Sequence, residues 1–393
     1  MVLRGLALTL ATWAIGALLL RATLVPAHQC PDYDPDAFEA SAQASVAWIE
    51  RSLQPDGRYV YEYNAATDSY PDDYNEVRHA GVTMSLYQYA AESGDTGPIE
   101  TADIALQRMI DISFEHGDWL AIQNPENRTV KLGSTSLALA GLALRRHATG
   151  DDQYDELMRR YGRFILEMQR PDGSFLNYWL PNTGAPDPTV TSKYATGEAF
   201  WALALMHNLF PGEGWDVPAI AVADYLALHR DEVEQFEFPP WADQWAAYGL
   251  SEMRTWPISD VQADYARSLA ERFGFLIRVE SQRSDALLVE EIHGGPTRAA
   301  GHGTWVEGLT SLYRLAAVDD RLADIRSDLR DRIDCGAGML VDRQVTSDAA
   351  ATYDDPSVAE GAWFSNNVTR MDDQQHALSG LIRAAVIARK ELE

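Results

Sequence analysis

The stretch YGRFILEMQRPDGSF, residues 161–175, decides the fold. It has the pattern of an amphipathic helix that ends in Gln-Arg-Pro-Asp-Gly, and an aromatic residue follows two positions after the glycine. The segment WIERSLQPDGRY, residues 48–59, repeats nearly the same phrase. We expect the glycine to take a positive-φ position at the helix end, and the aromatic residue, Tyr59 or Phe175, to return to the core. A hairpin on Pro-Asp-Gly is the alternative for either copy alone, but two copies after two helices predict a repeated unit.

Helical periodicity recurs from end to end, whereas strand-like segments are few: RYVYEY at 58–63 and FLIRVE at 275–280. The segment 361–364 is at most a distant version of the helix-end phrase. The expected helices are 35–53, 75–92, 97–114, 133–148, 152–169, 193–209, 217–230, 239–254, 258–274, 298–316, 319–333 and 372–390. They form consecutive pairs, and helical hairpins must stack to bury their apolar faces.

The two members of each pair differ in composition. The second is rich in Gly, Ala and Ser, as in LGSTSLALAGLAL, and small residues permit the close approach that an inner ring requires. The first, such as DDQYDELMRRYGRFILEMQ, is charged on one face, as a solvated outer helix would be. We therefore predict an all-α (α/α)6 toroid over residues 28–393, with short loops and minor strand content. Its inner helices would be 75–92, 133–148, 193–209, 239–254, 298–316 and 372–390.

The order Gln, Gly and aromatic resembles the repeat of squalene cyclases and prenyltransferases. The six-hairpin architecture is similar to the (α/α)6 carbohydrate-active families, namely glucuronyl C5-epimerase-like domains, unsaturated-glucuronyl hydrolases and polysaccharide lyases. The first resemblance implies terpenoid cyclisation, although the acidic Asp-x-Asp-Asp initiator of the cyclases is not matched. The second implies carbohydrate chemistry, as a hydrolase, lyase or epimerase.

The N-terminus indicates export. Arg4 is followed by GLALTLATWAIGALLL, an apolar run of signal-peptide length, and then by Arg21 and ATLVPAHQ. Residues 1–27 are expected to be a signal peptide or an N-terminal membrane anchor, and the protein to be periplasmic or extracellular. Contact with the membrane would be through this segment only. Cys30 and Cys335 either close one disulfide in that oxidising setting or remain unpaired.

Charge and composition exclude some functions. The net charge is −27, and only Lys131, Lys193 and Lys390 are lysines among 32 basic residues. A nucleic-acid partner is not expected, because phosphate binding needs a basic field. No CxxC motif or Cys/His cluster has metal-ligand spacing, so neither a metal nor another cofactor is expected.

In a toroid the N-termini of all inner helices converge on one rim of the central funnel. Helix dipoles and free backbone N–H groups favour an anionic ligand there. Most of the predicted inner helices also carry a basic residue near their start: Arg78, Lys131, Lys193, Arg298 and Arg370. In so acidic a chain this placement predicts a carboxylate-bearing ligand, hence a uronate-type sugar. The alternative is that these cations only pair with neighbouring carboxylates and set the geometry of the barrel.

The candidate residues all lie at this rim. Those expected to bind substrate are Arg78, His79, Lys193, Arg298, Arg370, Trp241, Trp305 and Asp373, the tryptophans by stacking on a sugar. Those expected to act in catalysis are Glu198, Asp243, Tyr194, His302 and His376. Glu198 and Asp243 could divide proton donation and water activation in glycoside hydrolysis. Epimerisation or β-elimination at C5 needs instead a base beside a neutralised carboxylate, for which Tyr194 or either histidine could serve with Lys193 or Arg298.

The sequence thus predicts an exported enzyme that acts on an acidic, uronate-containing glycan by metal-independent acid/base catalysis. Two alternatives stay open. A terpenoid or polyprenyl cyclase-like enzyme would need an apolar, aromatic funnel with few charges at the rim. A non-catalytic glycan-binding toroid would keep the tryptophans but lack a proton-transfer pair within reach of one ligand atom.

Overall fold

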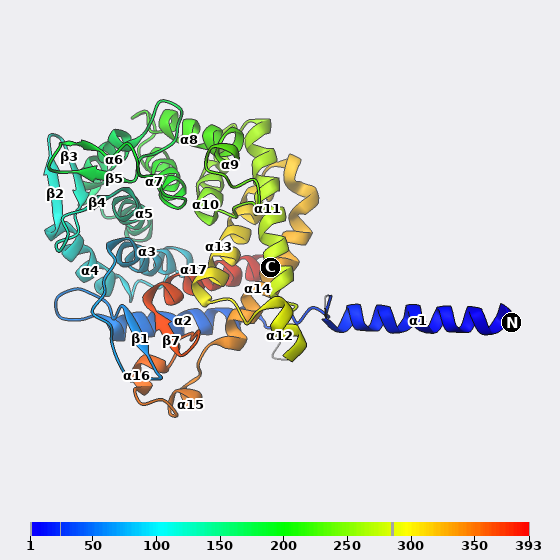
Figure 1. Ribbon diagram of the computed structural model, residues 1–393. Helices are drawn as coiled ribbons and strands as arrows, with labels where there is room; N and C mark the ends of the chain where they lie inside the picture. The colour runs from blue at the N-terminus through cyan, green and yellow to red at the C-terminus, as the bar shows by residue number, and fades with distance from the viewer. Residues whose placement is uncertain (1, 24, 284–286, 393) are drawn as a thin grey trace.

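The computed structural model describes residues 2–23, 25–283 and 287–392, and it confirms the predicted all-α toroid (Figure 1). The inner ring consists of α3 (Glu76–Ser93), α5 (Leu132–Thr149), α7 (Ala195–Leu209), α10 (Gln244–Glu252), α13 (Ala299–Ala316) and α17 (Met371–Leu392). The outer ring consists of α2 (Pro35–Ser52), α4 (Ile99–Asp111), α6 (Asp155–Met168), α8 (Asp216–Leu228), α11 (Asp260–Glu280) and α14 (Arg326–Arg343). Each inner helix packs on its two inner neighbours, and α17 returns to α3, so that the ring closes.

Glycine lets the inner helices approach closely, as the composition predicts. A Cβ atom at Gly303 in α13 would lie 2.4 Å from the carbonyl carbon of His376 in α17. This is far shorter than a van der Waals contact, so any larger residue would push the two helices apart. The close approach of α13 and α17 also brings together side chains at the rim.

Some helix boundaries differ from the predictions. Residues 319–333 begin as a 3-10 turn, η2 (Asp320–Ile325), whose first turn is capped by the Asp319 carboxylate, and α14 starts only after it. The inner helix α10 begins later than residue 239, because Pro239 and Pro240 lack the N–H groups that a helix interior needs. A short helix α9 (Arg230–Val233) follows α8, and a 3-10 turn η1 (Met253–Thr255) follows α10.

The segment FLIRVE is helical, which corrects its strand-like interpretation. It forms the last turns of α11, which begins at a capping box of Ser259 and Gln262. Leu269, Phe273 and Ile277 are buried along this helix at a spacing of four residues. That spacing places them on one helical face, and the short alternation of apolar residues in FLIRVE hid this longer period.

The helix-end phrase forms a tight turn after its outer helix. α6 has its C-cap at Gln169, and Gly173 has a φ of 90°, so the glycine closes the turn rather than the helix. Gln169 and Phe175 form a single antiparallel bridge, so the turn is also a miniature hairpin. Gly57, with a φ of 80°, repeats the arrangement in the first copy. Both aromatic residues, Tyr59 and Phe175, are buried as expected.

A third copy of the phrase is split by an insertion. Gln344 follows α14 as Gln169 follows α6, and Gly361, with a φ of 79°, takes the glycine position. The Gln169 amide donates to the carbonyl of Pro218 in α8, and the Gln344 amide donates to that of Ser41 in α2. The insertion carries α15 (Ser347–Ala350) and α16 (Pro356–Ala359). Gln169 and Gln344 therefore each tie the end of one outer helix to the next outer helix.

The described residues form three small antiparallel sheets, two of which lead into inner helices at the rim. β1 (Glu62–Asn64), from the segment RYVYEY and its neighbour, pairs with β7 (Val368–Arg370), which leads directly into α17. β4 (Val130–Lys131), which leads into α5, pairs with β5 (Tyr178–Leu180), and β5 pairs with β6 (Ala185–Pro186). β2 (Ser113–His116) and β3 (Trp119–Ile122) form a hairpin. Because β4 and β7 end at Lys131 and Arg370, the sheets fix these two cations at the start of their helices.

The N-terminal helix α1 (Val2–Thr23) projects away from the toroid beside α12 (Leu287–His293) (Figure 1). Within the described residues it is the one helix long and apolar enough to cross a membrane. Cys30 and Cys335 form a disulfide, which settles the two alternatives left by the sequence. Pro26, assigned above to the N-terminal segment, contacts the toroid: its carbonyl accepts a 3.2 Å hydrogen bond from the amide of Gln282.

Candidate active site

The first residues of all six inner helices line one cavity of about 730 Å³ at the rim. Its polar and aromatic lining comprises Asn75, Arg78, Lys131, Asn177, Ser192, Tyr194, Glu198, Trp241, Gln244, Trp245, Arg298, Thr304, Trp305, Arg370, Asp372, Gln375 and His376. The convergence of helix N-termini predicted from the sequence is therefore observed. The other candidate residues lie outside the lining: His79, Lys193, Asp243, His302 and Asp373.

On one side of the cavity, which we call the arginine side, three arginines are held by two aspartates. One carboxylate oxygen of Asp372 lies 3.1 Å from Nε of Arg78, and the other lies 3.0 Å from Nε of Arg370. Nε of Arg298 lies 2.8 and 2.9 Å from the two oxygens of Asp373. These three cations are paired with carboxylates. The pairing agrees with the alternative given above, in which such cations set the geometry of the barrel.

Asp373 joins two helices and does not face the cavity. Its carboxylate accepts hydrogen bonds from the backbone N–H groups of Arg370, at 2.9 Å, and Ala300, at 3.0 Å. Burial raises the pKa of Asp373 to about 6, against the opposing charge of Arg298. The carboxylate therefore holds the starts of α17 and α13 together, and direct substrate binding by Asp373 has no support in this geometry.

On the opposite side, which we call the lysine side, two lysines and a glutamate come from the starts of α5 and α7. Lys131 lines the cavity with its ammonium 5.7 Å from the ring centre of Tyr178. Lys193 lies outside the lining, with its ammonium 4.3 Å from the ring centre of Trp241, which lines the cavity. No carboxylate among the described residues forms an ion pair with either lysine. Both charges are therefore available to a ligand.

Glu198, in the first turn of α7, is the buried carboxyl group of the lysine side. It is 4 % exposed, and its Oε2 packs so closely on Gly133 that a Cβ there would lie 2.2 Å away. Burial, and then the charge of Asp243, raise the pKa of Glu198 to about 8. The carboxyl group is therefore protonated at neutral pH, which is the state that a general acid requires.

Asp243, the predicted partner of Glu198, is occupied by other contacts. It is fully buried, and one carboxylate oxygen caps α10 by accepting from the N–H groups of Trp245, at 2.9 Å, and Ala246, at 3.2 Å. The other oxygen pairs with the buried guanidinium of Arg230. With both oxygens engaged and no face on the cavity, Asp243 is not placed to activate a water, so we do not retain it as a catalytic candidate.

His376 on α17 forms a dyad with a buried glutamate. Its Nδ1 lies 2.9 Å from Oε2 of Glu307 on α13, and its ring lines the cavity. Burial lowers the pKa of His376, but the charge and hydrogen bond of Glu307 raise it more, so that the pKa lies above its usual value. Because Nδ1 is bonded to Glu307, Nε2 is the ring nitrogen left for a ligand.

The other two candidate histidines lie away from the cavity. Nδ1 of His302 is 3.3 Å from Arg343 on the outer helix α14, and burial together with the Arg343 charge lowers the pKa of His302 to about 4. His79 is hydrogen-bonded to the hydroxyl of Tyr74 at 2.6 Å and to the carbonyl of Ala105 at 3.0 Å. Burial lowers its pKa to about 3. Both rings pack toward the outer shell, so neither is placed to act on a ligand.

The aromatic candidates do face the cavity. Trp241 and Trp305 are half-buried in its wall, and Tyr194, which also lines the cavity, is 42 % exposed. The rings of Tyr194 and Trp241 meet edge to face at 5.4 Å. They present flat apolar surface next to charged groups, an arrangement suited to stacking on a sugar ring.

Glu307, an acidic residue within a Gly-, Thr- and Leu-rich inner helix near the rim, was given no role among the candidate residues above. A carboxylate buried in such a helix needs a partner. That partner, His376, is far along the chain, and only the close approach of α13 and α17 reveals the pair. Asp372 was not among the candidate residues either, although it pairs with two arginines in the cavity wall.

No known protein family and no curated protein matches the sequence. Solved structures do. An unsaturated glucuronyl hydrolase specific for heparin matches with a TM-score of 0.63 at 12 % identity, over 90 % of this chain and 98 % of that one. Cellobiose 2-epimerase from Spirochaeta thermophila matches with a TM-score of 0.59 at 13 % identity, over 91 % of this chain and 99 % of that one. A type II terpene cyclase from Scytonema matches with a TM-score of 0.53 at 12 % identity, over 89 % of this chain and 98 % of that one. At such identities the likeness concerns the fold alone, and the fold is that of the (α/α)6 toroids.

Proposed function

We propose that this protein is an enzyme that moves a proton at the carbon next to the carboxylate of a uronate sugar. The observation that carries the proposal is the pairing of unlike groups in one cavity: a neutral carboxyl group, Glu198, and a histidine, His376, that is backed by a carboxylate. Pairs of titratable groups whose surroundings push their pKa values apart are typical of acid and base in catalysis. A non-catalytic glycan-binding toroid would not need such a pair.

The chemistry assigns one role to each group. Nε2 of His376 removes the proton from C5, and Lys131 neutralises the adjoining carboxylate as negative charge develops on it. In β-elimination Glu198 then gives its proton to the departing O4, so that the C4–O4 bond breaks and a C4–C5 double bond forms. In epimerisation Glu198 instead returns a proton to C5 from the opposite face. In both cases His376 gains one proton and Glu198 loses one.

Glycoside hydrolysis fits this cavity less well. It requires two carboxyl groups, one to donate a proton and one to activate water or attack the sugar. Among the lining residues only Glu198 and Asp372 carry carboxyl groups, and Asp372 is held between Arg78 and Arg370. Terpenoid cyclisation fits least, since the funnel would have to be apolar, whereas Arg78, Lys131, Arg298 and Arg370 line this one.

The neighbours in structure support carbohydrate as the substrate class. Two of those above are a glucuronyl hydrolase and a sugar epimerase, and a D-mannose isomerase also shares the fold with a TM-score of 0.57. The apolar α1 and the disulfide support work outside the cytoplasm, because disulfides persist in oxidising compartments.

The proposal is tested by incubating the protein in D2O with oligosaccharides that contain glucuronate, mannuronate or galacturonate. We expect one of two outcomes: an inverted C5 that carries deuterium, which identifies epimerisation, or a C4–C5 double bond, whose C5 carries no hydrogen, which identifies β-elimination. New reducing ends without either change at C5 would identify a hydrolase and contradict the proposal. Matched neutral oligosaccharides, in which each carboxylate is reduced to an alcohol, serve as the control and should not react.

A further inference from the structure

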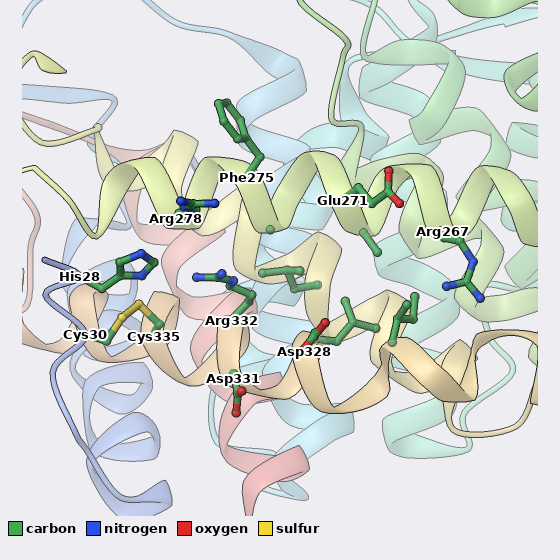
Figure 2. A pocket seen from close by; sticks show the side chains of 15 residues that line it. His28, Cys30, Arg267, Glu271, Phe275, Arg278, Asp328, Asp331, Arg332 and Cys335 are labelled. Atoms are coloured by element: carbon green, nitrogen blue, oxygen red, sulfur yellow. A yellow bond between two sulfur atoms is a disulfide. The ribbon is translucent and has the colours of Figure 1, made fainter. Parts of the chain in front are cut away.

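A second cavity, of about 550 Å³, lies outside the barrel between the outer helices α11 and α14 (Figure 2). We call it the α11–α14 groove. The disulfide between Cys30 and Cys335 borders one end of it, so the arm that leads to α1 runs past this end. Figure 2 shows Arg278 of α11 and Arg332 of α14 reaching into the groove beside His28 and the disulfide.

These two arginines are unusual in this protein because they have no carboxylate partner. Most arginines of the chain form ion pairs, as expected where acidic residues far outnumber basic ones. Neither Arg278 nor Arg332 does so with any described residue, although Glu271, Asp328 and Asp331 also line the groove. Their guanidinium groups are therefore free to bind an external anion.

The base of α1 adds a third such cation. Arg21, in the last turn of α1, also lacks a carboxylate partner among the described residues. The pKa of His28 is lowered by burial and then by the charges of Arg332, Arg278 and Arg21, which places all three arginines within electrostatic range of one point. The arm is held there by the disulfide and by the hydrogen bond from Gln29 N to the carbonyl of Ser281, at 2.6 Å.

The adjoining helix indicates what the anion is. α1 is exposed along its whole apolar length, with Leu8, Trp13 and Leu18 each more than two thirds exposed, so a bilayer is its natural surrounding. If α1 spans a membrane, its basic end lies at the headgroup layer, and the disulfide-bound arm holds the groove next to that layer. Phosphate is the anion that a headgroup layer supplies, and guanidinium groups bind phosphate through two hydrogen bonds at once.

We propose that α1 stays in the membrane and that the α11–α14 groove binds the phosphate of an anionic phospholipid through Arg278 and Arg332. A molecule with a net charge of −27 is repelled by an anionic bilayer, so it needs a local positive site to approach one. The site orients the toroid with α11 and α14 toward the lipid. It extends the membrane contact beyond the N-terminal segment, to which the sequence analysis confined it, and it does not rest on the proposed enzymatic function.

The test uses the full chain in nanodiscs of equimolar phosphatidylcholine and phosphatidylglycerol. Native mass spectrometry then gives the ratio of the two lipids that stay bound to the released protein. We expect enrichment of phosphatidylglycerol in the wild type. Each juxtamembrane arginine is expected to increase the preference for the anionic lipid about fivefold, so the enrichment in the Arg278→Ala, Arg332→Ala double variant should fall by about 25-fold. The exposed Arg278→Gln variant, which carries little risk to folding, should lose about fivefold.

The matched control is the Arg128→Ala, Arg170→Ala double variant, which removes two other arginines that form no ion pair with a described carboxylate, from loops far from α1 along the chain. It should bind lipid like the wild type. Equal binding of both lipids by the wild type, or equal losses in the groove and control variants, would overturn the proposal. Displacement of phosphatidylglycerol by stoichiometric inorganic phosphate would also overturn it, because the site would then be one for a soluble anion.

Discussion

The two sides of the rim both present positive charge to the cavity, but they hold it differently. On the arginine side, Arg298 is bound to Asp373, which in turn ties together the first turns of two helices. On the lysine side, the ammonium of Lys131 lies over an aromatic ring, and neither Lys131 nor the buried Glu198 has an oppositely charged partner among the residues that the structure describes. The charges on one side are therefore satisfied by the fold, and those on the other side are not.

This difference separates structural from chemical use of the same residue types. A buried ion pair fixes geometry, and its members are committed to each other. A buried carboxyl group without a cation stays neutral and costs stability whenever it ionises, so its retention in a cavity indicates a function. The lysine side is therefore where we expect the chemistry, and the arginine side is its frame.

The largest effect is expected from Glu198→Gln. The amide keeps the shape of the side chain but has no acidic proton to give, so kcat should fall by about 10²–10⁴-fold. Ligand binding and the melting temperature should change little. Steady-state kinetics on whichever uronate oligosaccharide reacts would measure this, and wild-type activity in the variant would place the acid elsewhere.

Asp243, the carboxylate at the start of the next inner helix, should show the opposite pattern: its replacement should lower stability more than turnover. Asp243→Asn breaks the buried pair with Arg230 and weakens the cap of α10, so we expect a loss of about 3–5 kcal/mol of unfolding free energy. Chemical denaturation monitored by tryptophan fluorescence would measure it. Turnover per folded molecule should fall less than that of Glu198→Gln, and a larger fall with unchanged stability would restore Asp243 as a catalytic candidate.

The pH profile should shift when the dyad is altered. Neutral His376 is the base, so activity should rise with pH through the His376 pKa, which lies above 6.5, and fall as Glu198 ionises near pH 8. Glu307→Gln removes the charge that raises the His376 pKa, so the acid limb of kcat/KM should move to lower pH. Glu307→Asp should keep most of the wild-type position. An unmoved acid limb in Glu307→Gln would mean that another group is the base.

The smallest effect concerns ligand charge. Lys131→Met should weaken binding of a uronate ligand about tenfold, or roughly 1.4 kcal/mol, because one charge-assisted contact is lost. A neutral analogue should bind as before, and stability should be unchanged because the ammonium pairs with no described carboxylate. Arg298→Met is the comparison, since it leaves Asp373 buried without its cation and should mainly destabilise the fold. Equal losses for charged and neutral ligands in Lys131→Met would contradict the division of the rim.

The fold was predictable because its signals are local and repeated. Helical periodicity, small residues in alternate helices and the phrase around Gly173 each lie within one segment of sequence. The position of the rim followed from topology alone. What could not be predicted is the direction in which each rim side chain points: His302 and His376 both lie in inner helices, yet one packs on Arg343 in the outer ring and the other lines the cavity.

The protonation state of Glu198 tests the account most directly, because both the contrast between the two sides and the role of general acid depend on it. Infrared difference spectroscopy between wild type and Glu198→Gln, recorded as a function of pH, would follow the carbonyl band of the neutral carboxyl group. We predict that the band persists through neutral pH and disappears at about pH 8. Loss of the band near pH 4.5, the ordinary pKa of a glutamate, would show that Glu198 is a carboxylate at neutral pH and would contradict the account.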